Sequence, residues 1–303
     1  MKFEVTILGN SSATPIFNRN PTSQILNINE SLLMIDCGEG TQQQLLLYGI
    51  KYNRIHHIFI SHLHGDHFFG LIGLISSMNL NGRTRSLKLF GPKNLLEILQ
   101  IQLKYSDTRL AFELEFVALD PENTGLIYET RDYTVETIPL NHRIPCTGFV
   151  FREKQRLRKI LKEKVEPLNI PADYYPLIKK GIDYVDKNGK VYKAIDLTVD
   201  PDIPRSYAYC SDTLMDNRYI KYLTKIDTLY HEATFMHDML DRAKETHHTT
   251  ASEAATIAEN IGAKKLLIGH FSARYKDLTP LLAEARAIFE KTYIAKQGET
   301  FEI

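Results

Sequence analysis

The sequence lacks tryptophan and has only three cysteines, Cys37, Cys146 and Cys210, among its 303 residues. These cysteines are odd in number and far apart, so they predict neither a disulfide framework nor a cysteine zinc site. No stretch is apolar for long enough to span a membrane, and the first residues lack the charged head and apolar run of a signal peptide. We therefore expect a cytoplasmic protein without a membrane partner.

The chain also lacks a net charge, because 37 Lys and Arg residues balance 37 Asp and Glu residues. A global basic field that would indicate a nucleic-acid partner is therefore absent. The charges are nevertheless uneven, since residues 152–193 contain twelve basic and six acidic residues. The densest basic stretch consists of Arg152, Lys154, Arg156, Arg158, Lys159, Lys162 and Lys164. On charge alone, this segment fits a clamp for a phosphate backbone and a solvated helix face equally well.

A content of 43% hydrophobic and 24% charged residues is typical of a soluble globular protein with a substantial core. Short strand-like runs alternate with helical runs, which favours a layered α/β fold. We expect strands at 23–28, 31–36, 58–60, 87–90, 114–118, 133–139, 206–210, 228–231 and 265–269, and helices at 39–48, 68–78, 93–105 and 252–261. Residues 151–205 differ, because a basic helical run ends at Glu166-Pro167 and several prolines and glycines follow. We interpret 1–303 as one domain and 151–205 as an insertion in it.

The most informative segment is Ser61-His62-Leu63-His64-Gly65-Asp66-His67, between an apolar strand and a helix. Three histidines and an aspartate so close together supply the imidazole and carboxylate donors that zinc and similar cations bind. His62 and His64 can point at one ion, while Asp66 and His67 can point at a second. A polar loop whose histidines only bond to backbone would explain a lone histidine better than four ligand-type residues.

Three further candidate ligands, His142, Asp212 and His270, each follow a strand-like run. Strand ends that meet at one edge of a sandwich would bring such side chains together. Asp212 is the natural bridging ligand, because one carboxylate offers two oxygens to two ions. Each of these residues alone is more often structural, and it is the histidine cluster that favours a metal site.

The pattern His-x-His-x-Asp-His with later His, Asp and His resembles the metallo-β-lactamase superfamily. Further segments narrow the resemblance to its transfer-RNA 3′-processing branch, the ribonuclease Z family; among them are Ile35 to Gln42, His231-Glu232-Ala233-Thr234, His248-Thr249-Thr250 and His270 to Tyr275. The resemblance implies a four-layer αβ/βα metallo-β-lactamase sandwich with an inserted basic arm, usually as a homodimer. It also implies two Zn²⁺ ions per subunit, and the same donors accept Mn²⁺ or Fe²⁺.

The resemblance assigns roles to individual residues. It implies that His62, His64 and His142 hold one zinc ion, that Asp66, His67 and His270 hold the other, and that Asp212 bridges them, with Asp36 in support. The arm would grip tRNA through Arg152, Lys154, Arg156, Arg158, Lys159 and Lys162. Arg274 is a candidate phosphate contact, although a structural ion pair explains it nearly as well. The Gly-Pro pair that short family members carry in the arm is missing here.

The expected reaction is two-metal hydrolysis of precursor tRNA after the acceptor stem, which leaves a 3′-hydroxyl on the tRNA and a 5′-phosphate on the trailer. Asp66 is expected to help orient the nucleophile. His248 would protonate the leaving group, and Glu232 would orient it and keep it protonated. One alternative is a phosphodiesterase for small or cyclic esters, which would not need the basic insertion. Another is a non-catalytic RNA-binding protein, which the complete ligand set disfavours.

Overall fold

The structure is a computed structural model that describes residues 2–303. Its residues group into two compact units. The larger, called the main unit, contains the chain up to Glu129, Val135–Phe151 and Arg205–Ile303, and the smaller, called the arm unit, contains Thr130–Thr134 and Arg152–Pro204. Among the described residues, no helix is both long enough and apolar enough to cross a membrane.

The first sheet of the main unit has seven strands in the order β18-β1-β2-β3-β4-β5-β6. Their bounds are β1 Phe3–Gly9, β2 Ser23–Ile28, β3 Ser31–Cys37, β4 Ile55–Phe59, β5 Leu87–Pro92, β6 Leu114–Leu119 and β18 Thr300–Glu302. Neighbours from β18 to β3 are antiparallel, and those from β3 to β6 are parallel. The hairpin between β2 and β3 turns at Asn29 and Glu30, which both have positive φ.

The second sheet also has seven strands, in the order β17-β16-β15-β14-β9-β8-β7. Their bounds are β7 Gly125–Glu129, β8 Tyr133–Leu140, β9 Cys146–Glu153, β14 Ser206–Cys210, β15 Thr228–Glu232, β16 Lys265–Gly269 and β17 Thr292–Ile294. The four strands from β14 to β17 are parallel neighbours. Such parallel strands are buried on both faces, which explains why β14, β15 and β16 are almost wholly buried.

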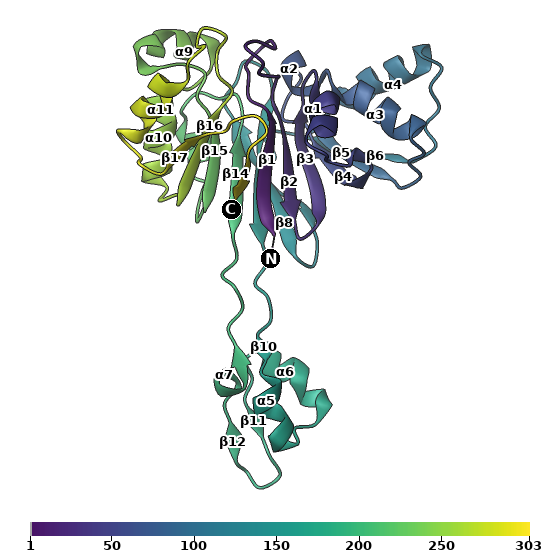
Figure 1. The fold of residues 1–303 in the computed structure, drawn as a ribbon, viewed down its shortest axis with the longest axis vertical. Helices are drawn as coiled ribbons and strands as arrows, with labels where there is room; N and C mark the ends of the chain where they lie inside the picture. The colour runs from purple at the N-terminus through teal and green to yellow at the C-terminus, as the bar shows by residue number, and fades with distance from the viewer. Residues whose placement is uncertain (1) are drawn as a thin grey trace. The chain divides into compact units, whose positions relative to one another are not determined.

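Helices cover the outer face of each sheet, as Figure 1 shows. Beside the first sheet lie η1 Tyr52–Arg54, α1 Thr41–Leu47, α2 Gly65–Phe68, α3 Leu71–Leu80 and α4 Leu95–Tyr105. Beside the second lie α8 Asn217–Ile220, η4 His237–Met239, α9 Leu240–Thr246, α10 Ala251–Asn260 and α11 Thr279–Arg286. Separate hydrophobic clusters fill each helix–sheet layer. Between the sheets, the ring of Phe59 lies 5.4 Å from that of Phe149 and 5.5 Å from that of Phe151. The predicted four-layer sandwich is therefore confirmed.

The helix predicted over 68–78 is divided into α2 and α3 at Phe69 and Gly70. At this point the chain passes very close to the loop after β3. The Gly70 amide donates to the Cys37 carbonyl at 2.9 Å, and a Cβ at Gly70 would lie only 2.1 Å from the Gly38 carbonyl oxygen. This close approach brings α2 against the end of β3, where Asp36 lies.

The arm unit has a small core of its own, formed by Val165, Ile170, Ile178, Ala194 and Leu197. Its elements are β10 Lys159–Ile160, α5 Lys162–Val165, η2 Glu166–Leu168, η3 Ala172–Tyr174, α6 Tyr175–Lys179, β11 Tyr184–Val185, β12 Val191–Tyr192, α7 Ala194–Leu197 and β13 Thr198–Val199. The prediction of a basic helical run up to Glu166 was wrong in its extent. Only α5 is helical there, because β10 pairs with β13, about forty residues later.

Candidate metal centre

The histidine-rich segment connects β4 to α2 at one edge of the first sheet. Ile60 donates its amide to Phe90 of β5, so the segment leaves the sheet from a fixed position. Helix α2 then begins at Gly65 and carries Asp66 and His67 in its single turn. The ends of β8, β14 and β16 supply His142, Asp212 and His270 to the same place. The structure thus brings together all seven residues that the sequence singled out as metal ligands.

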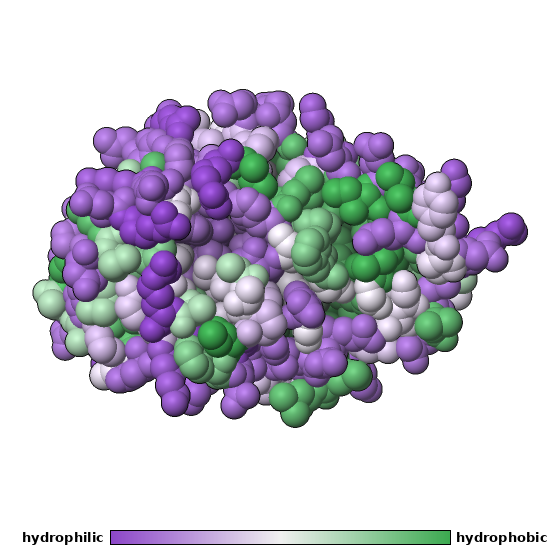
Figure 2. Space-filling model, turned by 90° about the horizontal axis from the view of Figure 1, so that it is seen from above, coloured by the Kyte–Doolittle hydropathy of each residue, from purple (hydrophilic) through white to green (hydrophobic). Residues whose placement is uncertain are grey.

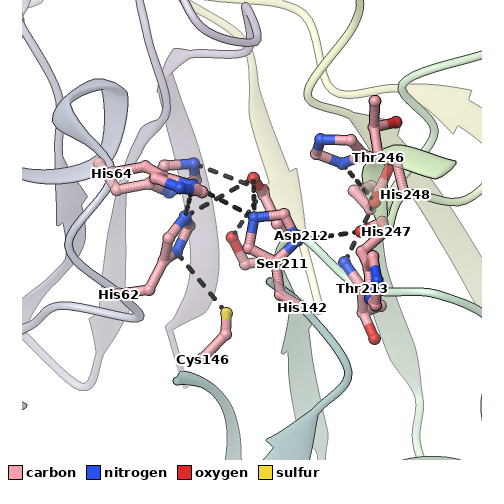
Figure 3. A network of polar contacts seen from close by, with 12 residues as sticks. His62, His64, His142, Cys146, Ser211, Asp212, Thr213, Thr246, His247 and His248 are labelled. Carbon is pink, nitrogen blue, oxygen red and sulfur yellow. Dashed lines mark hydrogen bonds and ion pairs between the residues drawn. The ribbon is translucent and has the colours of Figure 1, made fainter. Parts of the chain in front are cut away.

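The first group consists of His62, His64, His142 and Asp212, whose candidate ligand atoms all lie within 4.8 Å of one another. His64 Nδ1 lies 3.1 Å from both His62 Nε2 and His142 Nε2. Asp212 Oδ2 lies 3.6 Å from His62 Nε2 and 3.7 Å from His142 Nε2. Figure 3 shows the three rings turned toward Asp212.

The second group consists of Asp66, His67 and His270. His67 Nε2 and His270 Nε2 lie 3.3 Å apart, and Asp66 Oδ2 lies 3.5 Å from the former and 3.4 Å from the latter. Asp212 approaches this group with its other oxygen, since Oδ1 is 3.4 Å from His67 Nε2 and 3.2 Å from His270 Nε2. The two oxygens of Asp212 therefore face two different groups.

The donor set fits divalent cations, as the ring of His142 shows. His142 Nδ1 donates to the carbonyl oxygen of His247 at 3.0 Å, so the Nε2 of the neutral ring carries a lone pair. Burial, partly opposed by Asp212, lowers the pKa of His142 to about 4, which keeps the ring neutral. That lone pair faces His64 Nδ1 and a carboxylate oxygen of Asp212. Acceptors that converge in this way are stabilised by a cation between them, and imidazole and carboxylate suit zinc.

Asp36 supports the candidate ligands through its contacts with Ser61 and His67. It is fully buried and has a φ of 55°. Its carboxylate accepts hydrogen bonds from the Ser61 amide at 2.7 Å and hydroxyl at 2.8 Å, and it contacts His67 Nδ1 at 2.8 Å. The Tyr209 hydroxyl donates to the same carboxylate at 2.6 Å. Sequence reasoning named Asp36 but missed Tyr209, because a tyrosine inside a buried strand looks like an ordinary core residue.

The His248 side chain lies beside both groups and pairs with Glu232. His248 Nδ1 is 2.9 Å from Glu232 Oε1, and Glu232 is completely buried at the end of β15. Burial alone would lower the pKa of His248, but the charge and hydrogen bond of Glu232 outweigh it and raise that pKa to about 9. The ring is therefore protonated at neutral pH. Its centroid lies 5.2 Å from that of His142 and 5.4 Å from that of His270.

A cavity of about 400 Å³ opens above these side chains, lined by His64, Asp66, Asp212, His248 and His270 among others. Arg143 also lines it and is exposed. Sequence reasoning missed Arg143, although its place directly after His142 was a usable signal. Viewed from above, the face in Figure 2 has a hydrophilic central hollow with hydrophobic side chains concentrated on one side.

The candidate RNA contacts are placed differently from one another. Arg274 donates to the Ser272 hydroxyl at 3.2 Å and lies over the Phe235 ring, so part of its guanidinium group already has partners within the main unit. In the arm unit, Arg158 donates to the Thr198 hydroxyl at 2.6 Å and pairs with Asp200. Lys159 and Lys162 are exposed, and the half-buried members are Arg152, Lys154, Arg156 and Arg158.

Comparisons with known proteins find chains of similar sequence and similar fold. The family model described as "Anti-Pycsar protein Apyc1" matches residues 3–158. Ribonuclease Z of Bacteroides fragilis is 49% identical over 98% of both chains, and ribonuclease Z of Cytophaga hutchinsonii is 48% identical over 100% of this chain and 97% of its own. Among solved structures, the short form of human tRNase Z is 27% identical, with a TM-score of 0.71 over 99% of both chains. The metallo-β-lactamase fold protein YhfI of Bacillus subtilis, at 18% identity and a TM-score of 0.69 over 99% of both chains, shares the fold.

Proposed function

This chain belongs to the ribonuclease Z family and is a metal-dependent endoribonuclease of tRNA 3′ processing, and from that premise we propose how its residues carry out the reaction. The substrate is precursor tRNA, and the bond cut is the phosphodiester after the acceptor stem. The products are a tRNA with a 3′-hydroxyl and a trailer with a 5′-phosphate. The observation that carries this proposal is the pair of ligand groups that share Asp212.

His62, His64 and His142 would hold one ion, Asp66, His67 and His270 would hold the second, and Asp212 would contact both. Two Zn²⁺ ions per subunit suit these nitrogen and oxygen donors, and Mn²⁺ or Fe²⁺ would be accepted by the same set. When bound, the pair of cations supplies an activated water at neutral pH and neutralises charge on the attacked phosphate.

Asp66 is suited to orient the attacking water. Its Oδ2 accepts a hydrogen bond from the Ala13 amide at 2.7 Å, which fixes the carboxylate at the wall of the cavity. A carboxylate held in this way can accept a hydrogen bond from water and direct it at the phosphorus. Arg143, on the same wall, can pair with a non-bridging phosphate oxygen.

His248 acts as the general acid in this proposal. The leaving atom is O3′ of the tRNA, a poor leaving group that needs a proton as the bond breaks. His248 is charged at neutral pH, lines the cavity and lies beside the ligands of both ions. Glu232 keeps the proton on the ring and fixes its orientation, since it also accepts from the amides of Thr213 and Thr249.

The insertion at 151–205 is the proposed tRNA-binding arm, and the basic residues from Arg152 to Lys162 are its phosphate contacts. Its independent core supports this role, because the charges sit on a folded unit. We also propose a homodimer, which the exposed apolar side chains Leu46, Leu47 and Phe69 support. A cytoplasmic location is supported by the three cysteines, which are all free and buried.

The test is cleavage of a 3′-extended precursor tRNA by the purified, metal-loaded protein. An Asp212→Ala variant and a metal-stripped sample serve as controls, and a small aryl phosphodiester is assayed in parallel. We expect a single cut beside the acceptor stem that both controls lose. Turnover of the aryl ester without any tRNA cleavage would instead identify a small-molecule phosphodiesterase.

A further inference from the structure

A second cavity, of about 450 Å³, lies in the main unit and contains none of the candidate metal ligands. It is lined by the loop after β1, the end of α11, and the chain from β17 to β18. Its charged side chains are Arg19, Arg286, Lys296 and Glu299. Lys296 forms an ion pair with Glu299 at 3.4 Å, so the two arginines give the cavity an excess of positive charge. Among the described residues, no carboxylate pairs with either arginine.

Arg19 is 91% buried, with 9% of its surface exposed, yet it is incompletely satisfied. Its Nη2 donates to the Tyr275 carbonyl at 2.9 Å, but within residues 2–303 neither Nε nor Nη1 has a hydrogen-bond partner. A buried charge without a counter-charge is costly unless something offsets it. An anion in the adjacent cavity would supply that counter-charge.

The cavity also offers aromatic surface next to its cations. Arg19 lies over the ring of Phe17, and Arg286 lies over the ring of Tyr293, each with its guanidinium carbon 5.7 Å from the ring centre. Phe17 is 45% exposed and Tyr293 is 40% exposed. Exposed rings beside guanidinium groups are the combination that binds a base together with its phosphate.

Phe17 is exposed at a strained position. Phe17 and Asn18 form the two central residues of a turn closed by Ile16 and Arg19, and their φ angles are 52° and 59°. Turns with positive φ at both central positions favour glycine, asparagine and aspartate, and a bulky residue there is an outlier. Strain of this kind persists where the surrounding structure holds the residue in place, and it is common at active sites and ligand-binding loops. An aromatic ring kept at such a position is consistent with a binding role.

The same loop connects the two cavities. Residues 12–15 line the cavity above the metal ligands, and the Ala13 amide bonds to Asp66, whereas Phe17, Asn18 and Arg19 line the second cavity. Phe17 is the fourth residue after Ala13, so their Cα atoms are at most about 14 Å apart. A strand of RNA whose scissile phosphate lies at the metal ligands would therefore extend as far as the second cavity within a few nucleotides.

We propose that this second cavity binds one nucleotide unit of the RNA substrate, with its phosphate against Arg286 and Lys296 and its base against Phe17 or Tyr293. The identification of the ligand as RNA rests on the proposed function. The shared chemistry is that of a nucleoside phosphate, whether part of an RNA strand or free. Arg19 supplies fixed positive charge behind the site.

The first test removes the two exposed charges in Arg286→Gln/Lys296→Gln. The matched control is Lys104→Gln/Lys291→Gln, which removes the same charge from exposed positions outside the cavity. For metal-loaded protein, we expect the cavity variant to raise KM for precursor tRNA about tenfold and to reduce the slope of log affinity against log salt by about 2. kcat and aryl phosphodiester turnover should stay within about twofold of the unaltered protein, and the control should change neither KM nor the slope comparably.

The second test titrates adenosine 5′-monophosphate while following the Arg286 Nε–H signal by NMR. A KM effect without a nucleotide shift supports an RNA strand as the ligand, and a saturating shift without a KM effect supports a free nucleotide. If neither occurs, the proposal is overturned. If the unaltered protein does not cleave precursor tRNA at all, the proposed function fails and the nucleotide titration alone decides the cavity's role.

A third variant, Phe17→Asn, separates binding from folding. Asparagine tolerates positive φ, so the replacement should keep or raise Tm while it raises KM for precursor tRNA several-fold. A lower Tm with an unchanged KM would mean that Phe17 serves only the fold, and the base-binding part of the proposal would be abandoned.

Discussion

Replacing Glu232 by glutamine should remove the charge that keeps His248 protonated. In the folded protein, Glu232 and His248 form a buried pair with 2.9 Å between Oε1 and Nδ1. Glutamine has almost the same shape and still offers an oxygen to that nitrogen, but it carries no charge. The general acid would then lose its proton at the pH at which the enzyme works.

The size of the effect follows from the pKa of His248. An increase from 6.5 to about 9 corresponds to about 3 kcal/mol in favour of the protonated ring. Without Glu232, burial is opposed only by the smaller contributions of Asp212 and Asp66, so the pKa falls toward the ordinary value of about 6.5. At pH 7.5 the protonated fraction would drop from nearly all to under about a tenth. We therefore expect kcat on precursor tRNA to fall about tenfold at pH 7.5, and the alkaline limb of its pH profile to move from near 9 toward 6.5.

The assay compares two leaving groups. Precursor tRNA expels an alkoxide and needs the acid, whereas a precursor with sulfur in place of the scissile O3′ expels a thiolate that needs little help. Glu232→Gln and His248→Ala should both be strongly impaired on the oxygen substrate and nearly normal on the sulfur substrate. The control is His247→Asn, because asparagine tolerates the φ of 57° at this neighbouring position.

Tm and bound metal must be measured beside these rates, because Glu232 also accepts from three backbone amides, those of Thr213, Thr234 and Thr249. Equal losses on the oxygen and sulfur substrates, with Tm and metal content preserved, would refute the acid role of His248. An alkaline limb that stays near pH 9 in Glu232→Gln would refute the role of the pair.

Three further predictions concern the support of the metal ligands, the acid stability of the fold and the arm. Asp36→Asn should weaken metal affinity about ten- to a hundredfold in a chelator competition, because the His67 ring loses its carboxylate partner; unchanged affinity would contradict this. Burial lowers the pKa of His57 to about 4, so its contribution to stability is complete above the unfolded value of 6.5 and is lost as pH falls toward 4. When the pH is lowered from 7.5 to 5, the free energy of unfolding should therefore fall by about 2 kcal/mol less in His57→Phe than in the unaltered protein. Denaturant titrations at the two pH values measure this difference. Deleting 154–193 should abolish tRNA cleavage and spare aryl phosphodiester hydrolysis, and efficient tRNA cleavage without these residues would disprove the arm assignment.

The sequence could group the candidate metal ligands because four of them lie in one short segment and the other three each follow a strand-like run. His62 to His67 are contiguous, and His142, Asp212 and His270 each end a recognisable strand. Strands that end at the same edge of a sandwich bring the residues after them together, so residues far apart in sequence could be grouped from the pattern of strands alone.

The supporting contacts could not be predicted in the same way. The hydroxyl of Tyr209 reaches Asp36 across 173 residues of chain, and the hydroxyl of Thr234 lies 2.9 Å from His270 Nδ1. Neither residue type differs from ordinary core residues in a buried strand or its end. The helix predicted for the basic run of the arm was wrong for a related reason. The run looks helical locally, whereas the pairing of β10 with β13 depends on residues distant in the sequence.

The most direct measurement of the central claim is the mass of both products from a 3′-extended precursor tRNA cut by the metal-loaded protein. The account predicts a tRNA that ends in a 3′-hydroxyl and a trailer that begins with a 5′-phosphate, because water attacks the phosphorus and His248 protonates O3′. A tRNA ending in a 3′-phosphate or a 2′,3′-cyclic phosphate would make O5′ the leaving atom and contradict the assigned roles.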